Sequence, residues 1–270
     1  MLQELARNII DIKKEFNRTL KTSSIISEII PDSEKWFNVE YKTIKQLHNF
    51  AENNPIYQKK EKIKIKETEY LLYQGDITEY YLSAKKYDTN YQPFYPTWLI
   101  TSLVLCLNSR ELGFNEIIDI GSGDGRIPYC GTILNMKSTS IELDKELVEL
   151  QKKICFRTNT NFDIINTDAS TYNLDEINVS KPTILISGLP EMGEMFVHHL
   201  NKTIRNSKFK KTCVVFIGSD TKRKYKDNTE FGWGEIIRKS QLKVIDRLTL
   251  PTHWTNYQDS NTTYIFTKYE

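Results

Sequence analysis

Three glycines at alternate positions, Gly121, Gly123 and Gly125, directly follow the mainly apolar run 116–120. The run predicts a strand, the glycines a tight turn, and the residues from Arg126 onward a helix. Glycine adopts backbone angles that other residues avoid, and it lets a ligand lie against the main chain. A dinucleotide-binding turn has the spacing G-x-G-x-x-G, whereas this turn has G-x-G-x-G and carries Arg126 where the third glycine would stand.

Two further predicted strands also lead into acidic residues. Residues 137–143 place Glu142 about twenty residues after the first glycine, where an acid commonly accepts hydrogen bonds from ribose hydroxyls. Residues 162–169 form the next strand, which leads to Asp168. Together with Asp119, these carboxylates would line one edge of a parallel sheet, and ligands bind beyond such strand ends. The alternative is a plain glycine turn with three unrelated acids, which the shared order and spacing disfavour.

These segments, Asp119-Ile-Gly-Ser-Gly-Asp-Gly125, Glu142 and Asp168-Ala169, resemble the cofactor-binding motifs of class I S-adenosylmethionine-dependent methyltransferases. The resemblance runs from about residue 91 to the C-terminus. It implies that Asp119 and the glycine turn contact the methionine part of the cofactor. It also implies that Glu142 binds the ribose and that Asp168 and Ala169 bind the adenine. The cofactor contacts expected in this way are Tyr95, Thr97, Asp119, Gly121, Ser122, Gly123, Asp124, Gly125, Glu142, Asp168 and Ala169.

The chemistry of the residues agrees with this cofactor. A ribose diol and an exocyclic amine are hydrogen-bond donors, and carboxylates accept from them. A positive sulfonium also tolerates acidic surroundings. Tyr95 and Thr97 belong to an aromatic segment that closes over the cofactor in related enzymes, although packing in the core explains them equally well. A nicotinamide cofactor is disfavoured by the glycine spacing and by Arg126.

The acceptor of the methyl group should lie at the exit of the fourth strand, where the resemblance places the substrate. This exit carries the expected substrate contacts Ser187, Gly188, Leu189 and Pro190. It lacks the Asn/Asp-Pro-Pro-aromatic motif typical of enzymes that methylate base amino groups. Glu191 follows, and it could either orient and deprotonate an amine as a catalytic group or favour a helix dipole.

A finer resemblance, in Tyr95-Pro96-Thr97, 119–127 and 261–266, is to compact protein-lysine methyltransferases outside the SET class. It implies protein lysine as the acceptor, with RNA or a small molecule as rivals. The long N-terminal region and Ser-Gly-Leu-Pro at 187–190 depart from that pattern. A catalytically silent binding subunit is the competing class, and the intact acids and glycines disfavour it.

The predicted fold class is α/β, a Rossmann-like seven-stranded methyltransferase sheet with helices on both faces, over residues 91–270. Its last two strands, 242–250 and 262–269, are expected to pair antiparallel, and Thr97 is expected to cap a helix over 98–108. Residues 1–90 are expected to form a mainly helical region that packs on this domain. It could cover the active site or bind a substrate protein, and a purely structural extension is an equally good alternative.

Within residues 1–90, helices are predicted over 2–20, from a cap at Ser33 through Phe50, and over 67–84. The lysine-rich segment 59–66 fits either a solvated edge strand or a charged helix flank. Its lysines could also bind an acidic partner, but the near balance of charge in the region favours a solvated strand.

Composition narrows the class of protein. The chain has 270 residues, 39% hydrophobic, and a formal net charge of +2, so no global nucleic-acid signature is present. Its 4 cysteines show no C-x-x-C spacing, so a bound metal is not expected and a reduced cytoplasmic protein is the simplest account. We expect neither a signal peptide nor a membrane span, because charges interrupt the first twenty or so residues and apolar runs are short.

Overall fold

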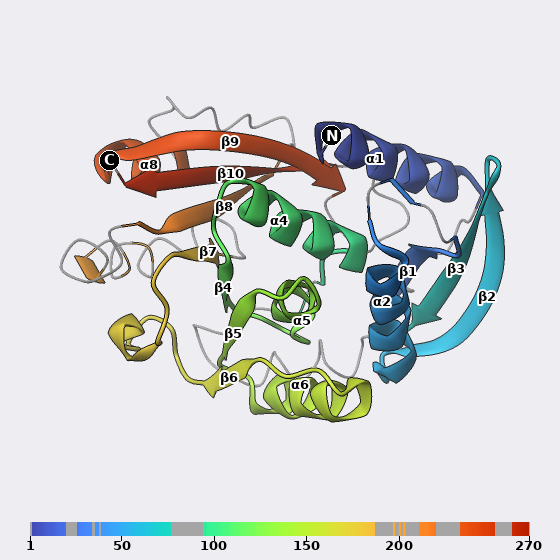
Figure 1. Ribbon diagram of the computed structural model, residues 1–270, viewed down its shortest axis with the longest axis horizontal. Coiled ribbons are helices and arrows are strands. Elements are labelled where there is room, and N and C mark those ends of the chain that lie inside the picture. The colour runs from blue at the N-terminus through green and yellow to red at the C-terminus, as the bar shows by residue number, and fades with distance from the viewer. Residues whose placement is uncertain are drawn as a thin grey trace.

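The described residues form two separate β-sheets in the computed structural model (Figure 1). The structure describes residues 2–19, 26–33, 36–37, 39–76, 94, 96–186, 197, 200, 202–203, 211–219, 233–251 and 261–269.

The larger sheet has seven strands in the order β6-β5-β4-β7-β8-β10-β9. Its strands are β4 (Glu116–Ile120), β5 (Lys137–Glu142), β6 (Asp163–Asn166), β7 (Pro182–Ile186), β8 (Cys213–Ser219), β9 (Leu242–Pro251) and β10 (Asn261–Tyr269). Neighbours from β6 to β8 are parallel, whereas β10 pairs antiparallel with both β8 and β9. The predicted fold class is therefore confirmed, including the antiparallel final pair. The strand order reverses between β4 and β7, which is where open sheets of this kind bind ligands.

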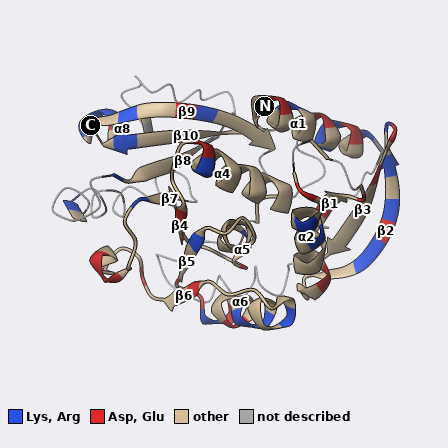
Figure 2. Ribbon diagram, viewed as in Figure 1, with Lys and Arg blue, Asp and Glu red and all other residues tan. Residues whose placement is uncertain are grey.

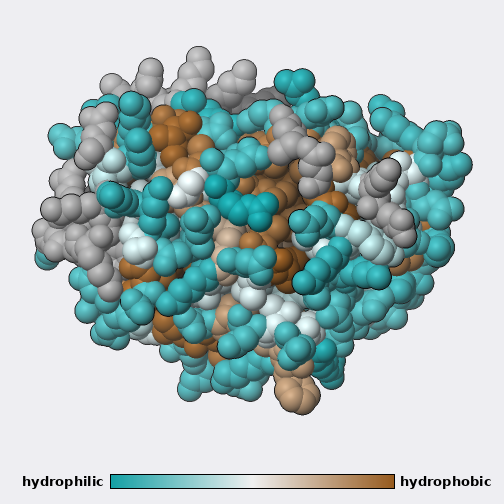
Figure 3. All heavy atoms as spheres, in the orientation of Figure 1, coloured by the Kyte–Doolittle hydropathy of each residue, from teal (hydrophilic) through white to brown (hydrophobic). Residues whose placement is uncertain are grey.

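Both faces of this sheet carry buried apolar side chains. Successive residues of a strand point to opposite sides, so apolar neighbours such as Ile117 and Ile118 lie on different faces. One face carries α4 (Leu99–Glu111), α5 (Arg126–Ile133) and α6 (Lys145–Thr158). The other carries the turn η2 (Leu174–Glu176) and α8 (Trp233–Lys239). In β4, Ile117 packs on the first side, and Ile118 and Ile120 pack on the second. Figure 3 shows hydrophobic residues gathering at the middle of one molecular face, over α4 and α5.

The described part of the N-terminal region combines two helices with a three-stranded antiparallel sheet, order β1-β3-β2. Its elements are α1 (Leu2–Thr19), β1 (Ile26–Pro31), α2 (Tyr41–Asn53), β2 (Tyr57–Ile65) and β3 (Thr68–Gly75). Helix α1 confirms the first predicted helix and packs against β9 and α4, and α2 packs against α5 and α6. The region thus lies against the larger sheet's helices and its edge, as Figure 1 shows.

Two predictions for this region need correction. The helix expected over 67–84 is wrong for 68–75, which is the central strand β3; residues 77–84 lie outside the described part. Tyr70 to Tyr73 form a continuous buried run, as a central strand allows. The second helix begins at Tyr41 instead of after Ser33, because the Trp36–Val39 bridge and a left-handed Phe37, φ 53°, form a turn first.

The lysine-rich segment is the exposed edge strand β2, which confirms the strand alternative (Figure 2). Lys60 pairs with Glu52 at 2.5 Å, Lys62 with Asp32 at 2.8 Å, and Lys64 with Glu67 at 3.3 Å. Exposed pairs of this kind add little stability, but charged side chains protect an open sheet edge from pairing with other chains. Acids of this chain already neutralise these lysines, which favours a solvated strand over a docking patch.

Gly75, where β3 pairs with both β1 and β2, provides a test of the small sheet. A Cβ at this position would lie 1.5 Å from the carbonyl oxygen of Ile56. We expect Gly75→Ala to lower the free energy of unfolding by roughly 3 kcal/mol, because backbone must move. Urea unfolding measures the loss, with Lys59→Ala on exposed β2 as the control. An unfolding midpoint equal to that of the parent would show that the sheet is built differently.

Candidate functional site

The three predicted acids lie at the ends of adjacent strands, as the sequence predicted. Asp119 is in β4, Glu142 ends β5, and Asp168 follows β6 by two residues. The order β6-β5-β4 places these strand ends side by side, and the Thr167 amide binds the Glu142 carbonyl oxygen at 3.1 Å. The carboxylates therefore share one edge of the sheet, beside the point where the strand order reverses.

The glycine turn connects β4 to α5 and needs glycine at each alternate position. Gly121, Gly123 and Gly125 have φ angles of 70°, 58° and 78°, which side chains strongly disfavour. A Cβ on Gly123 would lie 2.3 Å from the ring of Phe94, so that ring packs directly on the turn. A Cβ on Gly121 would meet nothing within 4 Å. The turn is therefore packed at Gly123 and open at Gly121.

Asp119 has a buried oxygen that the rest of the described chain leaves unsatisfied. Its carboxylate is 1% exposed, and Oδ2 accepts a hydrogen bond from Ser122 Oγ at 2.7 Å. Oδ1 is buried and has no partner among the described residues. Buried polar atoms are nearly always paired, so this oxygen is suited to a donor from a ligand. Burial raises the pKa of Asp119 to about 7. The hydrogen bond from Ser122 lowers this pKa, and the nearby carboxylates of Glu142 and Asp124 raise it further.

Glu142 makes contacts with the glycine turn that the sequence did not predict. Its Oε2 accepts from the Gly123 amide at 2.7 Å, and its Oε1 accepts from the Asp144 amide at 2.9 Å. The carboxylate thus helps to shape the glycine turn. A carboxylate offers about four lone-pair sites, so capacity remains for the two hydroxyls of a ribose. Burial raises the pKa of Glu142.

Asp168 and Ala169 are both half-buried in the turn after β6. Asp168 Oδ1 accepts from the Ser170 amide at 2.8 Å, which fixes the turn. Ala169 packs against the core on the α8 side of the sheet. Both residues lie at the edge that the sequence predicted, next to Glu142.

Thr97 is close to the site but does not cap a helix, contrary to prediction. Helix α4 begins at Leu99, and Trp98 stands at its cap position without a capping side chain. The carboxylate of Glu28, in β1, accepts from the Leu99 amide at 2.8 Å instead. Thr97 Oγ1 lies 3.4 Å from the hydroxyl of Tyr264, in β10.

Several predicted site residues lie outside the described part of the chain. They are Tyr95, Ser187, Gly188, Leu189, Pro190 and Glu191.

Two residues that sequence reasoning left out contact the glycine turn. Gln151 donates to the Gly123 carbonyl oxygen at 2.7 Å and is fully buried. Its signal in the sequence is a polar residue among the apolar residues Leu147, Leu150 and Ile154, which are buried on α6. Phe94, 8% exposed, packs on Gly123. Its position before α4 carried no specific signal beyond its aromatic ring.

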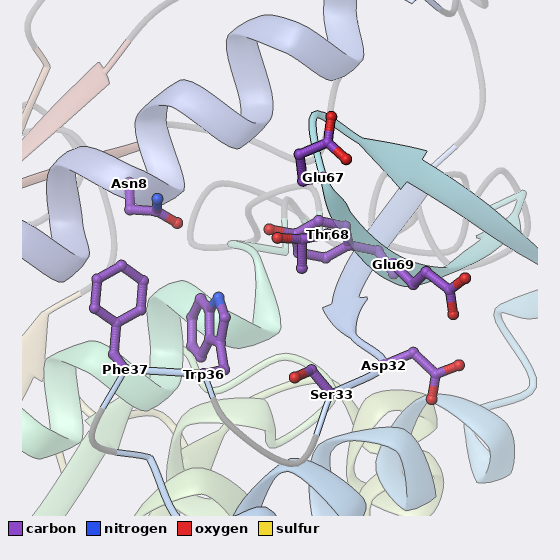
Figure 4. Close-up of a pocket in the computed structure, with 9 residues that line it drawn as sticks. Asn8, Asp32, Ser33, Trp36, Phe37, Glu67, Thr68 and Glu69 are labelled. Atoms are coloured by element: carbon purple, nitrogen blue, oxygen red, sulfur yellow. The ribbon is translucent and has the colours of Figure 1, made fainter.

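A separate pocket of about 500 Å³ lies in the N-terminal region, between α1 and the small sheet (Figure 4). Its lining includes the rings of Trp36, Phe37 and Tyr70. None of the predicted site residues lines this pocket, so it is distinct from the strand-end edge. Its carboxylates Asp32 and Glu67 are the partners of lysines on β2.

The described residues were compared with the requirements of a metal site and of a membrane-spanning helix. Within those ranges, no group of three or more His, Cys, Asp or Glu side chains is placed to hold a metal ion. No helix in the described ranges combines the length and the apolar character that crossing a membrane requires.

Comparison with known proteins gave structural likenesses only. A scan against protein-family models and a search of curated proteins each found no match. The chain is similar to the structure of a proposed RNA methyltransferase from Pyrococcus horikoshii, with 17% identity, 71% of this chain and 97% of that chain covered, and a TM-score of 0.47. The chain is similar, too, to a TehB-like S-adenosylmethionine-dependent methyltransferase from Corynebacterium glutamicum. Their sequence identity is 16%, the match covers 63% of this chain and 88% of that chain, and the TM-score is 0.43.

The chain is also similar to the glycopeptide N-methyltransferase MtfA complexed with S-adenosylmethionine, with 10% identity, 68% and 99% coverage, and a TM-score of 0.47. Identities and TM-scores this low carry no argument about activity. The functional case rests on the strand order and the site residues of this chain.

Proposed function

We propose that this protein is an S-adenosylmethionine-dependent methyltransferase. The single observation that carries the proposal is the buried Oδ1 of Asp119, which has no partner among the described residues and belongs to the strand that leads into the glycine turn. A carboxylate oxygen there suits a cationic donor such as the α-ammonium of the cofactor's methionine part. Glu142 would accept from the ribose hydroxyls, and Asp168, with the backbone at Ala169, would bind the adenine.

When bound, S-adenosylmethionine supplies a methyl group on a sulfonium, which is already an activated leaving group. The protein then needs chiefly to position the acceptor and to keep water away. We assign these tasks to the exit of β7, residues 187–190. Glu191 would orient an acceptor amine there or take its proton.

We propose protein lysine as the acceptor, on the resemblance of Tyr95-Pro96-Thr97, 119–127 and 261–266 to protein-lysine methyltransferases. RNA and small molecules are the rival acceptors. Residues 1–90 would contribute to partner binding. The described cysteines are all unpaired, which suits a reducing cytoplasmic setting.

Incubation with labelled methyl donor and separate protein, RNA and metabolite pools tests this function. Label in the protein pool supports lysine as the acceptor, and amino-acid analysis then identifies the methylated residue. Label confined to RNA or to metabolites overturns the lysine assignment while keeping the activity. Label in none of the pools favours the silent binding subunit.

The raised pKa of Asp119 predicts that cofactor binding releases a proton. The carboxyl is largely protonated at pH 6, and an ammonium ligand favours the ionised form, so its pKa falls on binding. We expect close to one proton released per ligand at pH 6 and about half a proton at pH 7. Affinity should rise as pH increases from 5.5 to 7, by roughly 15-fold as the ionised fraction grows.

Calorimetric titration in two buffers of different ionisation enthalpy measures this release. Glu142, Asp124 and the thiol of Cys106 also interact with the charge of Asp119, so these groups could contribute to the proton release. The Asp119→Asn variant, titrated at high ligand concentration, measures the release that does not come from Asp119. The variant should release far fewer protons per bound ligand than the parent. Equal heats in both buffers for the parent would contradict a protonated Asp119.

A further inference from the structure

Arg126 links the glycine turn to the N-terminal region. Its Nε and Nη2 donate to the two oxygens of Asp124, at 2.9 and 2.6 Å, within the turn. Nη1 donates to Glu28 Oε1, at 2.5 Å, and to the carbonyl oxygen of Thr97. Nη2 also donates to the hydroxyl of Tyr57 at 3.2 Å. All five guanidinium N–H groups therefore have acceptors, and two of these acceptors belong to the N-terminal region.

The N-terminal region also holds Asp124 directly. Asn54 Nδ2 donates to Asp124 Oδ2 at 2.9 Å, while Asn54 Oδ1 accepts from the Ile56 amide at 3.1 Å. Tyr57 closes the ring by donating to Glu28 Oε1 at 3.0 Å. These contacts to Asp124 and Arg126 thus come from three elements: β1 with Glu28, the end of α2 with Asn54, and β2 with Tyr57.

Burial makes these contacts costly to lose. Glu28 and Asp124 are 0% exposed, Asn54 is 1% exposed and Arg126 is 3% exposed. Removing one partner from a buried ion pair leaves an uncompensated charge or an unpaired donor. Contacts from the N-terminal region therefore add to those of Glu142 and Gln151 in fixing the turn between Gly123 and Gly125.

We propose that Glu28 and Asn54 are positioning residues for the cofactor turn, so that the N-terminal region completes the cofactor site without touching the ligand. Glu28 holds Arg126 and the first turn of α4 at once, with one oxygen for each. Asn54 fixes the carboxylate of Asp124, and thereby the backbone between two left-handed glycines. This inference rests on the proposed function for its ligand, but the geometry of the turn can be tested alone.

Glu28→Gln tests the proposal at constant side-chain volume. A glutamine offers only one acceptor oxygen, so its NH₂ group must face either the Leu99 amide or Arg126. Two hydrogen-bond donors would then face each other, and one hydrogen bond would be lost. Asn54→Ala removes the second contact. Ile29→Val is the matched control, because Ile29 is buried in the same strand, points to the opposite face and loses only a methylene.

The first readout is amide hydrogen exchange of Gly121, Gly123 and Gly125 in the cofactor-free protein. Each of these amides donates a hydrogen bond, so exchange reports on the arrangement of the turn. We expect at least tenfold faster exchange in Glu28→Gln and Asn54→Ala and little change in Ile29→Val. The second readout is the Kd for S-adenosylmethionine, measured well below each unfolding midpoint. It should rise roughly tenfold in the two variants and less than twofold in the control.

Unchanged turn exchange and unchanged Kd in Glu28→Gln, with only a lower unfolding temperature, would overturn the proposal and leave the residue with a structural role. A parent protein that binds no S-adenosylmethionine would instead sink the proposed function, while the exchange data still decide the positioning role. If Glu28→Gln fails to fold, Tyr57→Phe removes one shared hydroxyl and keeps the charged side chains of Glu28 and Arg126 in place. It should then show the same faster exchange, on a smaller scale.

Discussion

The Asp119→Asn variant is expected to bind S-adenosylmethionine roughly 100-fold more weakly than the parent protein. The substitution keeps an oxygen to accept from Ser122 but removes the charge that would pair with an ammonium. A buried hydrogen bond to a charged group contributes about 3 kcal/mol at most, which corresponds to roughly 100-fold in Kd. The Kd is measured by calorimetric titration, with the exposed Asp163 changed to Asn as the control.

The same variant should be at least as stable as the parent at pH 8. The folded-state pKa of Asp119, about 7, lies above its unfolded value, so ionisation opposes folding. Its contribution to stability is full below pH 4, declines as pH rises toward 7 and is lost above that. The variant's stability relative to the parent should therefore improve from pH 5 to pH 8 in thermal unfolding. A variant that binds the cofactor as tightly as the parent would remove Asp119 from the site.

Gly121→Ala is expected to abolish measurable cofactor binding while the protein stays folded. The new Cβ would meet no protein atom within 4 Å and would enter the space where the ligand is proposed to lie against the main chain. The φ angle of 70° adds a backbone cost of about 1 kcal/mol. Binding should therefore fall far more than stability does.

Gly113→Ala is the matched control for that backbone cost. Gly113 has φ 83°, and its Cβ would come no closer than 3.4 Å to the flexible end of Lys181, away from the site. The two variants should lose similar unfolding free energy, but only Gly121→Ala should lose affinity. Equal affinities in the two variants would mean that the open side of the turn holds no ligand.

The sequence was informative wherever the signal was local. The strand, turn and helix around 116–126 and the acids at 142 and 168 are set by neighbouring residues, so their placement could be predicted. The roles of Glu28 and Arg126 could not, because the two side chains are 98 positions apart and meet only in the folded protein. Arg126 drew attention as a charge in place of a glycine, but its partners were invisible from the sequence.

Misassigned elements share a physical cause, the influence of tertiary packing on local preference. The segment 68–75 was predicted as a helix, and it is a strand in the fold because β1 and β2 pair with its two edges. Thr97 is a good capping residue by type, yet a carboxylate from β1 caps α4 instead. Residues 187–191, at which we propose that the acceptor binds, lie outside the described part of the chain.

Calorimetric titration of the purified chain with S-adenosylmethionine and, separately, with NAD⁺ tests the central claim most directly. The account predicts saturable, one-to-one heat with S-adenosylmethionine, lost in Gly121→Ala, and none with NAD⁺. Binding of NAD⁺ alone would contradict it, because the acids and the glycine turn would then serve a different nucleotide.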